Sequence, residues 1–168
     1  MGFDLSGVNP KMNMKPEEFP VYHKHNKMEF RDRLHILDKD EKLSNQYWKE
    51  YDEYQEANPG IYFRNNVWWW RPLWQFICDE FPDLLDDNDV EQGSYNGGHE
   101  ITEDKAMKIG IGLTAMLESG DVKEYADSHR EYVEQLDDDD FNKHYPFNVE
   151  NVEQFAKFCL ESGGFEIC

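Results

Sequence analysis

The sequence predicts a mainly helical protein with about five helices and one small β element; an α+β fold is the alternative. Three observations support this prediction. Apolar residues recur every three or four positions in several segments, and most of these segments begin at a residue that can cap a helix and end at glycine or proline. Aromatic residues make up 15% of the 168 residues, which favours a folded chain over an acidic disordered one. We expect residues 1–168 to form a single domain.

The first part of the chain predicts one strand pair and one clear helix. Two short alternating segments, Phe3–Leu5 and Tyr62–Arg64, can pair as strands. Between them Val21–Leu43 fits a helix or a strand, and a helix is favoured. A clearer helix begins at Ser44, which can cap it, and ends at Asn58-Pro59-Gly60. Tyrosines at positions 47, 51 and 54 share one face of it, opposite a charged face that includes residue 50, and we interpret them as facing the core.

The second part of the chain predicts the remaining helices. Pro72 fits the first turn of a helix better than its interior, so the main helix is expected to begin near Arg71 and to end before Pro82. The segment Asp83–Gly98 is typical of a long acidic loop. Three further helices are expected to begin at the capping residues Thr102, Asp121 and Asn148 and to end at Gly120, Asp137–Asp140 and Gly163-Gly164.

Negative charge is concentrated in the second part of the chain. Met1–Arg71 contains 12 acids and 11 bases, whereas Pro72–Cys168 contains 24 acids and 6 bases, which gives the net charge of −19. A surface this acidic repels nucleic acids and membranes and attracts basic proteins. We therefore expect no direct nucleic-acid partner and no membrane partner.

The numbers and spacing of cysteine and histidine residues indicate the cellular compartment and whether a metal site is expected. The three cysteines, at positions 78, 159 and 168, include no CxxC pair, which favours reduced thiols in a cytoplasm. No apolar run approaches the roughly 20 residues of a membrane span, and the N-terminus has no signal-peptide pattern. His23 and His25 could share a metal ion if they lay on a strand, but no second ligand pair is visible. We predict a cytoplasmic protein with no metal and no cofactor.

Three stretches of the sequence carry a resemblance. They are MGFDLSGVNP at residues 1–10, YFRNNVWWWRPLW at 62–74 and YPFNVENVEQFAKFCLESGGFEIC at 145–168. With them the chain resembles a family of small uncharacterised proteins of bacteriophages and bacteria, over less than a third of its length. The resemblance implies a phage-type origin and no particular activity. Relatives are often shorter after the opening, which implies that Met12–Gly60 is an insertion, and they often carry a CxxC-type segment where this chain has DDDDFNKH.

The acidic segments suggest a surface that binds a partner protein. Helices can display carboxylates in rows that imitate the phosphates of a duplex, although acids also serve solubility alone. The leading hypothesis is a non-enzymatic phage-type inhibitor that binds a basic host protein, such as a nuclease or another nucleic-acid-binding defence component, in the host cytoplasm. The predicted partner-binding residues are Asp79, Glu80, Asp83, Asp86, Asp87, Asp89, Glu124, Asp127, Glu131, Glu134, Asp137, Asp138, Asp139 and Asp140.

A rival hypothesis is a protein that binds or sequesters a small molecule or a nucleotide signal. Arginine, asparagine and clustered tryptophans supply the directed hydrogen bonds and flat surfaces that such a pocket needs. The residues of this alternative site are Arg64, Asn65, Asn66, Trp68, Trp69, Trp70, Arg71, Tyr95, Asn96 and His99. A third reading is an oligomeric scaffold that uses the tyrosine stripe. No complete catalytic signature is present, so we predict no enzyme and no catalytic residue.

Overall fold

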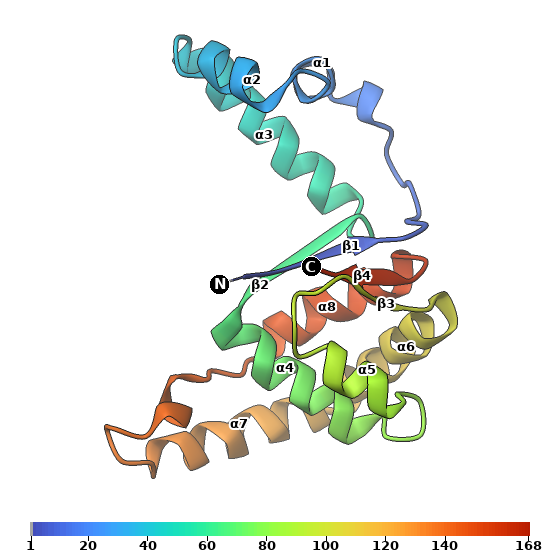
Figure 1. Cartoon of the computed structure of the whole chain (residues 1–168), viewed down its shortest axis with the longest axis vertical. Helices are drawn as coiled ribbons and strands as arrows, with labels where there is room; N and C mark the ends of the chain where they lie inside the picture. Colours follow the sequence, from blue (N-terminus) through green and yellow to red (C-terminus); the bar gives the residue numbers. More distant parts are fainter. Residues whose placement is uncertain (1) are drawn as a thin grey trace. The chain divides into compact units, whose positions relative to one another are not determined.

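The computed structural model describes residues 2–168, which divide into two compact units (Figure 1). The main unit is formed by residues 2–11 together with Pro59–Cys168, and the insert unit is formed by Met12–Asn58. The predicted organisation is a single domain in which Met12–Gly60 is an insertion. The limits of the insert unit lie within two residues of the insertion that the resemblance implies, Met12–Gly60.

The main unit contains a four-stranded antiparallel sheet in the order β2-β1-β4-β3. Its strands are β1 (Gly2–Gly7), β2 (Tyr62–Asn66), β3 (His99–Ile101) and β4 (Phe165–Ile167). The pairing of β1 with β2, in which Asp4 lies opposite Arg64, confirms the predicted strand pair. The other two strands have three residues each, which is too short to leave an alternating pattern in the sequence.

The described residues form eight α-helices, more than the five predicted, and the protein is mainly helical as expected. The main unit contains α4 (Val67–Glu80), α5 (Asp87–Gln92), α6 (Glu103–Ser119), α7 (Asp121–Glu134), α8 (Val149–Glu161) and a short 3₁₀ helix, η2 (Phe141–His144). No helix within residues 2–168 is long and apolar enough to cross a bilayer.

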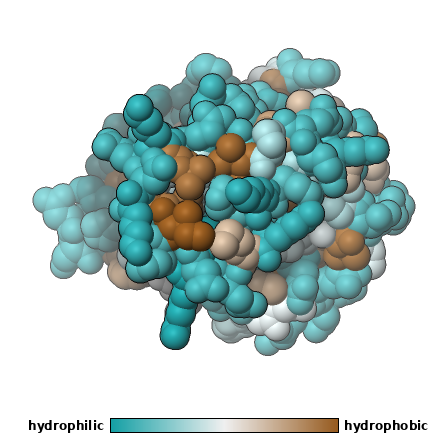
Figure 2. All heavy atoms as spheres, turned by 90° about the horizontal axis from the view of Figure 1, so that it is seen from above, coloured by the Kyte–Doolittle hydropathy of each residue, from teal (hydrophilic) through white to brown (hydrophobic). Residues whose placement is uncertain are grey.

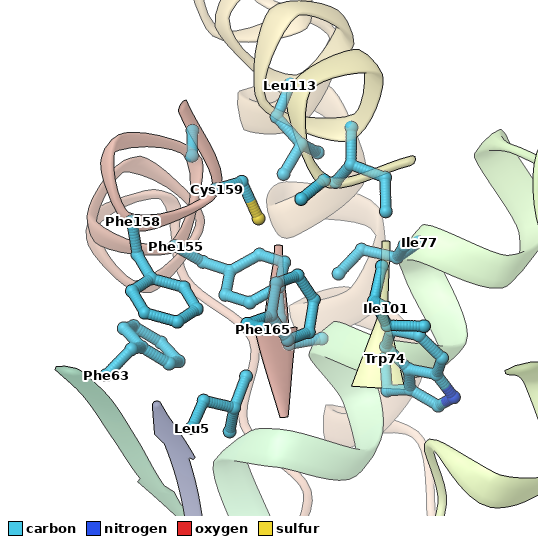
Figure 3. Close-up of a cluster of buried hydrophobic side chains, with 14 of the residues drawn as sticks. Leu5, Phe63, Trp74, Ile77, Ile101, Leu113, Phe155, Phe158, Cys159 and Phe165 are labelled. Carbon is cyan, nitrogen blue, oxygen red and sulfur yellow. The ribbon is translucent and has the colours of Figure 1, made fainter. Parts of the chain in front are cut away.

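One face of the sheet carries the core of the main unit (Figure 3). Leu5 and Phe63 from the sheet lie beside Phe155 and Phe158 of α8, and the rings of Phe63 and Phe155 are 5.2 Å apart. Alternation along β1 and β4 sends every second side chain into this core and leaves the other face polar. Burial of this apolar face is the main favourable term in folding.

Helix α4 begins earlier than predicted. The side chain of Asn66 accepts hydrogen bonds from the amides of Trp68 and Trp69, so the helix begins at Val67 and not near Arg71. Pro72 therefore lies inside the helix and is buried. A proline there leaves the carbonyl of the residue four places earlier without its helical donor. The cap at Asn66 and the burial of Trp70 and Trp74 in the same helix offset this loss.

Two other predictions about local structure need correction. The expected acidic loop contains α5, whose first turn is a capping box in which Asp86 and Asp89 each accept the other's backbone amide. Helix α7 has Gly120 rather than Asp121 as its N-cap, and the same glycine ends α6 with a left-handed φ of 93°. Asn148 caps α8 as predicted.

The insert unit contains η1 (Pro16–Glu18) and three helices, α1 (Pro20–Asn26), α2 (Phe30–Leu37) and α3 (Glu41–Ala57). Asp40 caps α3, so this helix begins before the predicted Ser44. The ring of Tyr22 packs against Tyr47, Tyr51 and Tyr54, which confirms that the tyrosine stripe faces a core. Two of these three tyrosines are buried, which leaves the proposed scaffold without an exposed stripe.

Glu50 lies inside the insert unit and not on the solvated face where the sequence analysis places it. Its side chain is 6% exposed and accepts the backbone amides of Val21 and Tyr22 at 2.7 and 2.9 Å. It therefore caps the first turn of α1 from another helix, where the side chain of Phe19 makes no capping bond. On the face of the molecule shown in Figure 2, hydrophilic residues cover most of the surface, the largest group of hydrophobic side chains lies near the centre, and smaller groups lie toward the edges.

Candidate functional site

A row of carboxylates lies along the outer side of α7. The helix buries its apolar side, with Val122 fully enclosed and Tyr125 packed against Phe76 of α4 at 4.6 Å between ring centres. The opposite side presents carboxylates at positions 124, 127, 131 and 134, spaced by three, four and three residues. At 1.5 Å per residue this row is about 15 Å long.

Most of this carboxylate row has no basic partner. Asp127 forms ion pairs with Lys123 and with Arg130, whose Nη2 lies 2.9 Å from Oδ1. The hydrogen bond from Lys123 is the main reason that the pKa of Asp127 lies below its usual value. Among residues 2–168, no ion pair involves the other three carboxylates of the row. Their charge is therefore available to a partner.

The end of α4 brings further acids close to α7. The pKa of Tyr125 lies above its usual value, mainly because the side chain is buried. The nearby charges of Asp79 and Glu80 raise this pKa further. Both carboxylates belong to the predicted set, and both are exposed. The two acidic segments of the sequence thus approach each other where α4 ends and α7 begins.

Asp89 belongs to the predicted surface but is enclosed by the protein. Its side chain is 4% exposed. Its Oδ1 lies 2.9 Å from Nε2 of His99, and its carboxylate forms an ion pair with Lys105. Hydrogen bonds to Asp89 and Asp86 raise the pKa of Lys105. Asp89 is therefore a structural residue that ties α5 to β3 and α6. Its spacing from Asp86 is a capping-box pattern, which could have shown this role in the sequence.

The acidic run Asp137–Asp140 lies in the loop after α7 and has mixed roles. Asp138 pairs with Lys143, whose hydrogen bond lowers the pKa of that carboxyl. Asp140 caps η2 by accepting the amide of Asn142 at 2.8 Å. The carboxylates at 137 and 139 are exposed, as are those at 83, 86 and 87 near α5.

An aromatic cluster adjoins this acidic run, and the sequence analysis does not predict it. The ring of Phe141 lies 5.2 Å from Trp68 and 5.6 Å from Tyr145, and it remains 59% exposed. A shallow cavity of about 520 Å³ is lined by Trp68, Phe141 and His144. Arg71 donates to the hydroxyl of Tyr145 at 2.8 Å and so fixes the loop to α4. Two aromatic residues and a histidine within five residues of one another, beside an acidic run, are the signal that could have revealed this cluster.

The ten residues of the alternative ligand site do not share one pocket. Arg64 lies on the polar face of the sheet, where it pairs with Asp4. Asn66 caps α4, His99 binds Asp89, and Asn96 donates to the carbonyl of Gly2. The rest line separate cavities: Trp68 in the aromatic cluster, Asn65 and Trp69 beside α8, and Trp70, Arg71 and Tyr95 in a cavity of about 270 Å³.

Trp70 and Trp74 hold α5 in place. The Nε1 of Trp70 donates to the carbonyl of Gly93 at 2.8 Å, and that of Trp74 donates to Val90 at 3.2 Å. The two indoles stack at 5.4 Å between ring centres, and Trp70 is fully buried. Both side chains therefore have a structural role, which removes Trp70 from the residues that present a flat surface to solvent.

Metal binding and thiol chemistry find little support in the described residues. His23 and His25 lie on α1, where residues two apart point to different sides, and His25 binds the carbonyl of Val21. No group of three metal-binding side chains occurs among residues 2–168. Burial raises the pKa of the Cys78 thiol to about 11, with smaller contributions from Asp79 and Asp89, so its nucleophilic thiolate is scarce at neutral pH.

Comparisons with known proteins give no relatives. No protein-family profile matches the chain, and neither a curated protein nor a solved structure is similar to it. The resemblance to the phage-borne family therefore stays a prediction.

Proposed function

We propose that the protein is a non-enzymatic phage-type inhibitor that binds a basic, nucleic-acid-binding defence protein of a bacterial host. The carboxylate row on α7 is the observation that supports this proposal most directly. Three of its four carboxylates have no basic partner among residues 2–168, and they are fixed on a helix that packs against the core. The phage-type origin rests on the sequence resemblance alone.

The geometry of the row suits a surface that normally meets a duplex. A duplex presents negative charges at regular intervals on a stiff frame, and its partners neutralise them with lysine and arginine. The row on α7 presents carboxylates at intervals of roughly 5 Å on an equally regular frame. A basic groove can therefore bind either a duplex or the carboxylate row on α7, through the same lysine and arginine side chains.

The aromatic cluster supplies the contact that charge alone does not provide. Charged groups across an interface steer association and set orientation, and buried aromatic side chains add a large share of the binding energy. Phe141 is exposed next to the carboxylates at 137 and 139. In the proposed complex it is the anchor, and the surrounding acids set the orientation of the partner.

The test is competition with duplex DNA. A host protein captured on the immobilised chain from a bacterial lysate is purified, and its binding to duplex DNA is measured with increasing amounts of this protein. We expect full displacement of the DNA, and an affinity that falls steeply as salt rises from about 50 to about 500 mM. Captured proteins that keep their DNA, or binding that salt does not change, would contradict the proposal.

Two matched variants locate the surface. Glu124→Gln, Glu131→Gln and Glu134→Gln together remove three charges from α7. The control variant, with Glu41→Gln, Asp52→Asn and Glu56→Gln, removes three exposed charges from the insert unit. We expect the first variant to lose most of its affinity and the control to keep it. Equal losses in both would mean that net charge, and not this row, determines binding.

The cavity of about 270 Å³ that is lined by Arg71 and Tyr95 favours a second candidate function, the binding of a small molecule or nucleotide signal. It joins two segments that the sequence analysis places in one ligand site. The test is a thermal-shift screen with nucleotides, because a tight ligand raises the melting temperature by mass action. A shift that Arg71→Ala abolishes supports this candidate, and no shift with any nucleotide counts against it.

A further inference from the structure

A cavity of about 560 Å³ lies between α7 and the segment that runs back along this helix to the start of α8 (Figure 1). Nε2 of His129 donates to the carbonyl of Tyr145 at 2.7 Å and holds the returning segment against the helix. The cavity is within the size range of small-molecule sites, roughly 300–1,000 Å³. It is therefore large enough to enclose a ligand.

The charge of this cavity is opposite to that of the chain around it. Pro72–Cys168 contains 24 acids and 6 bases, whereas the cavity is lined by three bases, Lys123, Arg130 and Lys143, and by one acid, Asp127. Half of the bases in this part of the chain thus line a single cavity. Bases that served only to balance nearby acids would be spread along the chain with those acids. Their concentration here indicates an anionic ligand.

The three cations are held in place and remain within reach of a ligand. Asp127 pairs with both Lys123 and Arg130, and Asp138 pairs with Lys143. Two carboxylates thus fix three cations, and one positive charge of this group is not compensated. The side chains of Lys123 and Arg130 are 73% and 66% exposed. Arg130 uses Nη2 to bind Asp127, and its guanidinium has further donors in a planar arrangement that suits a carboxylate.

Apolar side chains form much of the remaining wall. Ala126 and Val133 belong to α7, and Pro146, Phe147 and Val149 belong to the returning segment and the start of α8. All five are partly exposed, so the protein itself does not fully cover this apolar surface. Only Phe147 is aromatic, and its ring already packs against other aromatic side chains of the main unit. The wall is therefore mostly aliphatic, and along α7 it is about 10 Å long.

We propose that this cavity binds a free fatty acid of medium chain length. The carboxylate accepts hydrogen bonds from Arg130 and Lys123, and the acyl chain covers the aliphatic wall along Ala126 and Val133. A nucleotide or inorganic phosphate would meet the cations but leave this wall uncovered, and an uncharged lipid would leave the cations without a new partner. The cavity shares Asp127 with the carboxylate row and Tyr145 with the aromatic cluster, but the proposal does not depend on a partner protein.

The test is isothermal titration calorimetry of the full chain with decanoate, octanoate, 1-octanol and acetate. We expect saturable binding of both fatty acids, with decanoate about tenfold tighter, because each further buried methylene tightens binding several-fold. 1-Octanol has the chain of octanoate without its charge, and acetate has the charge without the chain. Each is expected to bind at least about tenfold more weakly than octanoate. An affinity for 1-octanol equal to that for octanoate, or no saturable binding of either fatty acid, overturns the proposal.

Two matched double variants test the role of the cations. Lys123→Gln with Arg130→Gln removes two charges from the cavity, at exposed positions where ion pairs add little stability. The control, Lys108→Gln with Lys157→Gln, removes two charges that pair with carboxylates four residues away on α6 and α8. We expect the cavity variant to bind octanoate at least about tenfold more weakly than the parent protein, and the control to bind it equally well. Equal octanoate affinity in the two variants contradicts the assignment.

A third variant tests the aliphatic wall without a change in charge. Ala126→Leu reduces the space for the acyl chain, so its affinity for decanoate should fall several-fold. Ser128→Leu adds the same side chain at an exposed position of α7 outside the cavity and is expected to leave the affinity unchanged. Melting temperatures of the same samples show whether each variant is folded. Decanoate affinity that neither Ala126→Leu nor the removal of the two cations reduces would place the ligand elsewhere and overturn the proposal.

Discussion

At the scale of single residues, Gly93 shows how one absent side chain positions a helix. Its carbonyl accepts the indole of Trp70, and its Cα lies so close to Trp74 that an added Cβ would stand 2.2 Å from the ring. No side chain can be added without displacing the indole. The glycine is required for close packing here and not for an unusual backbone angle, since its φ is −64°.

Gly93→Ala is therefore expected to destabilise the protein by about 1–3 kcal/mol, because overpacking forces the indole off its place. Gly97→Ala is the matched control, since nothing lies within 4 Å of its Cβ position and its φ is not positive. Urea denaturation followed by tryptophan fluorescence measures both. Equal stability of the two variants would show that the contact with Trp74 yields easily.

Glu50 makes the insert unit sensitive to acid. Burial acts to raise its pKa, but hydrogen bonds from Gln46 and from the amides of Tyr22 and Val21 outweigh burial and hold the pKa below its ordinary value of 4.5. A carboxyl whose pKa is lower in the folded state contributes stability above its unfolded pKa, and this contribution is lost as pH falls through the folded pKa.

We expect Glu50→Gln to reduce the free energy of unfolding by about 1–2 kcal/mol at pH 7. Between about pH 5 and pH 3 the variant should lose less stability than the parent protein, because the titrating group is gone. Denaturation curves at several pH values test this. Glu56→Gln, an exposed position on the same helix, is the control and should follow the parent protein.

At the scale of elements, the sequence predicts those whose signals are local. Asn148 before an apolar stripe and Gly163-Gly164 after it define α8 closely, as the structure confirms. The predicted start of α4 is wrong, because the side-chain cap at Asn66 begins the helix at Val67 even though this places Pro72 in its interior. Helix α5 is missed because its six residues include no apolar period. It is stabilised by its capping box, by the contacts of Asp89 with other elements, and by the indoles of Trp70 and Trp74.

The carboxylates of α7 act on the helix according to their distance from its ends. Glu124 lies in the first turn, where negative charge complements the dipole, and Glu134 lies in the last turn, where it opposes the dipole. Glu134→Lys should therefore stabilise the protein by about 0.3–1 kcal/mol, and Glu124→Lys should destabilise it by a similar amount.

Partner binding separates the two effects. Both lysine variants remove a carboxylate from the row, so we expect both to weaken displacement of DNA from the captured partner while their melting temperatures move in opposite directions. Thermal denaturation and the competition assay on the same samples measure this. If Glu134→Lys bound the partner better than the parent protein and Glu124→Lys bound it worse, in line with their stabilities, the row would affect binding only through folding.

At the scale of the whole molecule, the insert unit begins and ends at one place. Asn58 is fully buried, accepts the amides of Asn13 and Met14, and donates to the carbonyls of Met14 and Tyr54. The two ends of the unit are thereby fixed side by side. Replacing Met12–Asn58 by a short glycine-asparagine turn should leave the main unit folded, with a melting temperature within about 5 °C of the parent protein. Circular dichroism and thermal denaturation test this, and loss of a cooperative transition would contradict it.

The candidate site is less predictable from the sequence than the fold. Composition alone indicates an acidic surface, and helical spacing identifies the row on α7. The sequence cannot show that Asp89 is enclosed or that Phe141 meets Trp68, because each depends on contacts between segments far apart in the chain. For the same reason three adjacent residues of the alternative ligand site, Trp68, Trp69 and Trp70, line different cavities in the fold.

The stacked indoles of Trp70 and Trp74 also have an optical consequence. Their ring centres lie 5.4 Å apart, so their excited states couple when the chain is folded and uncouple when it is not. Because both indole N–H groups donate to the α5 segment, at Val90 and Gly93, release of this segment is expected to change the near-ultraviolet ellipticity of the pair. A change in that signal without a change in helix content would reveal detachment of this one segment in any variant, with no label attached.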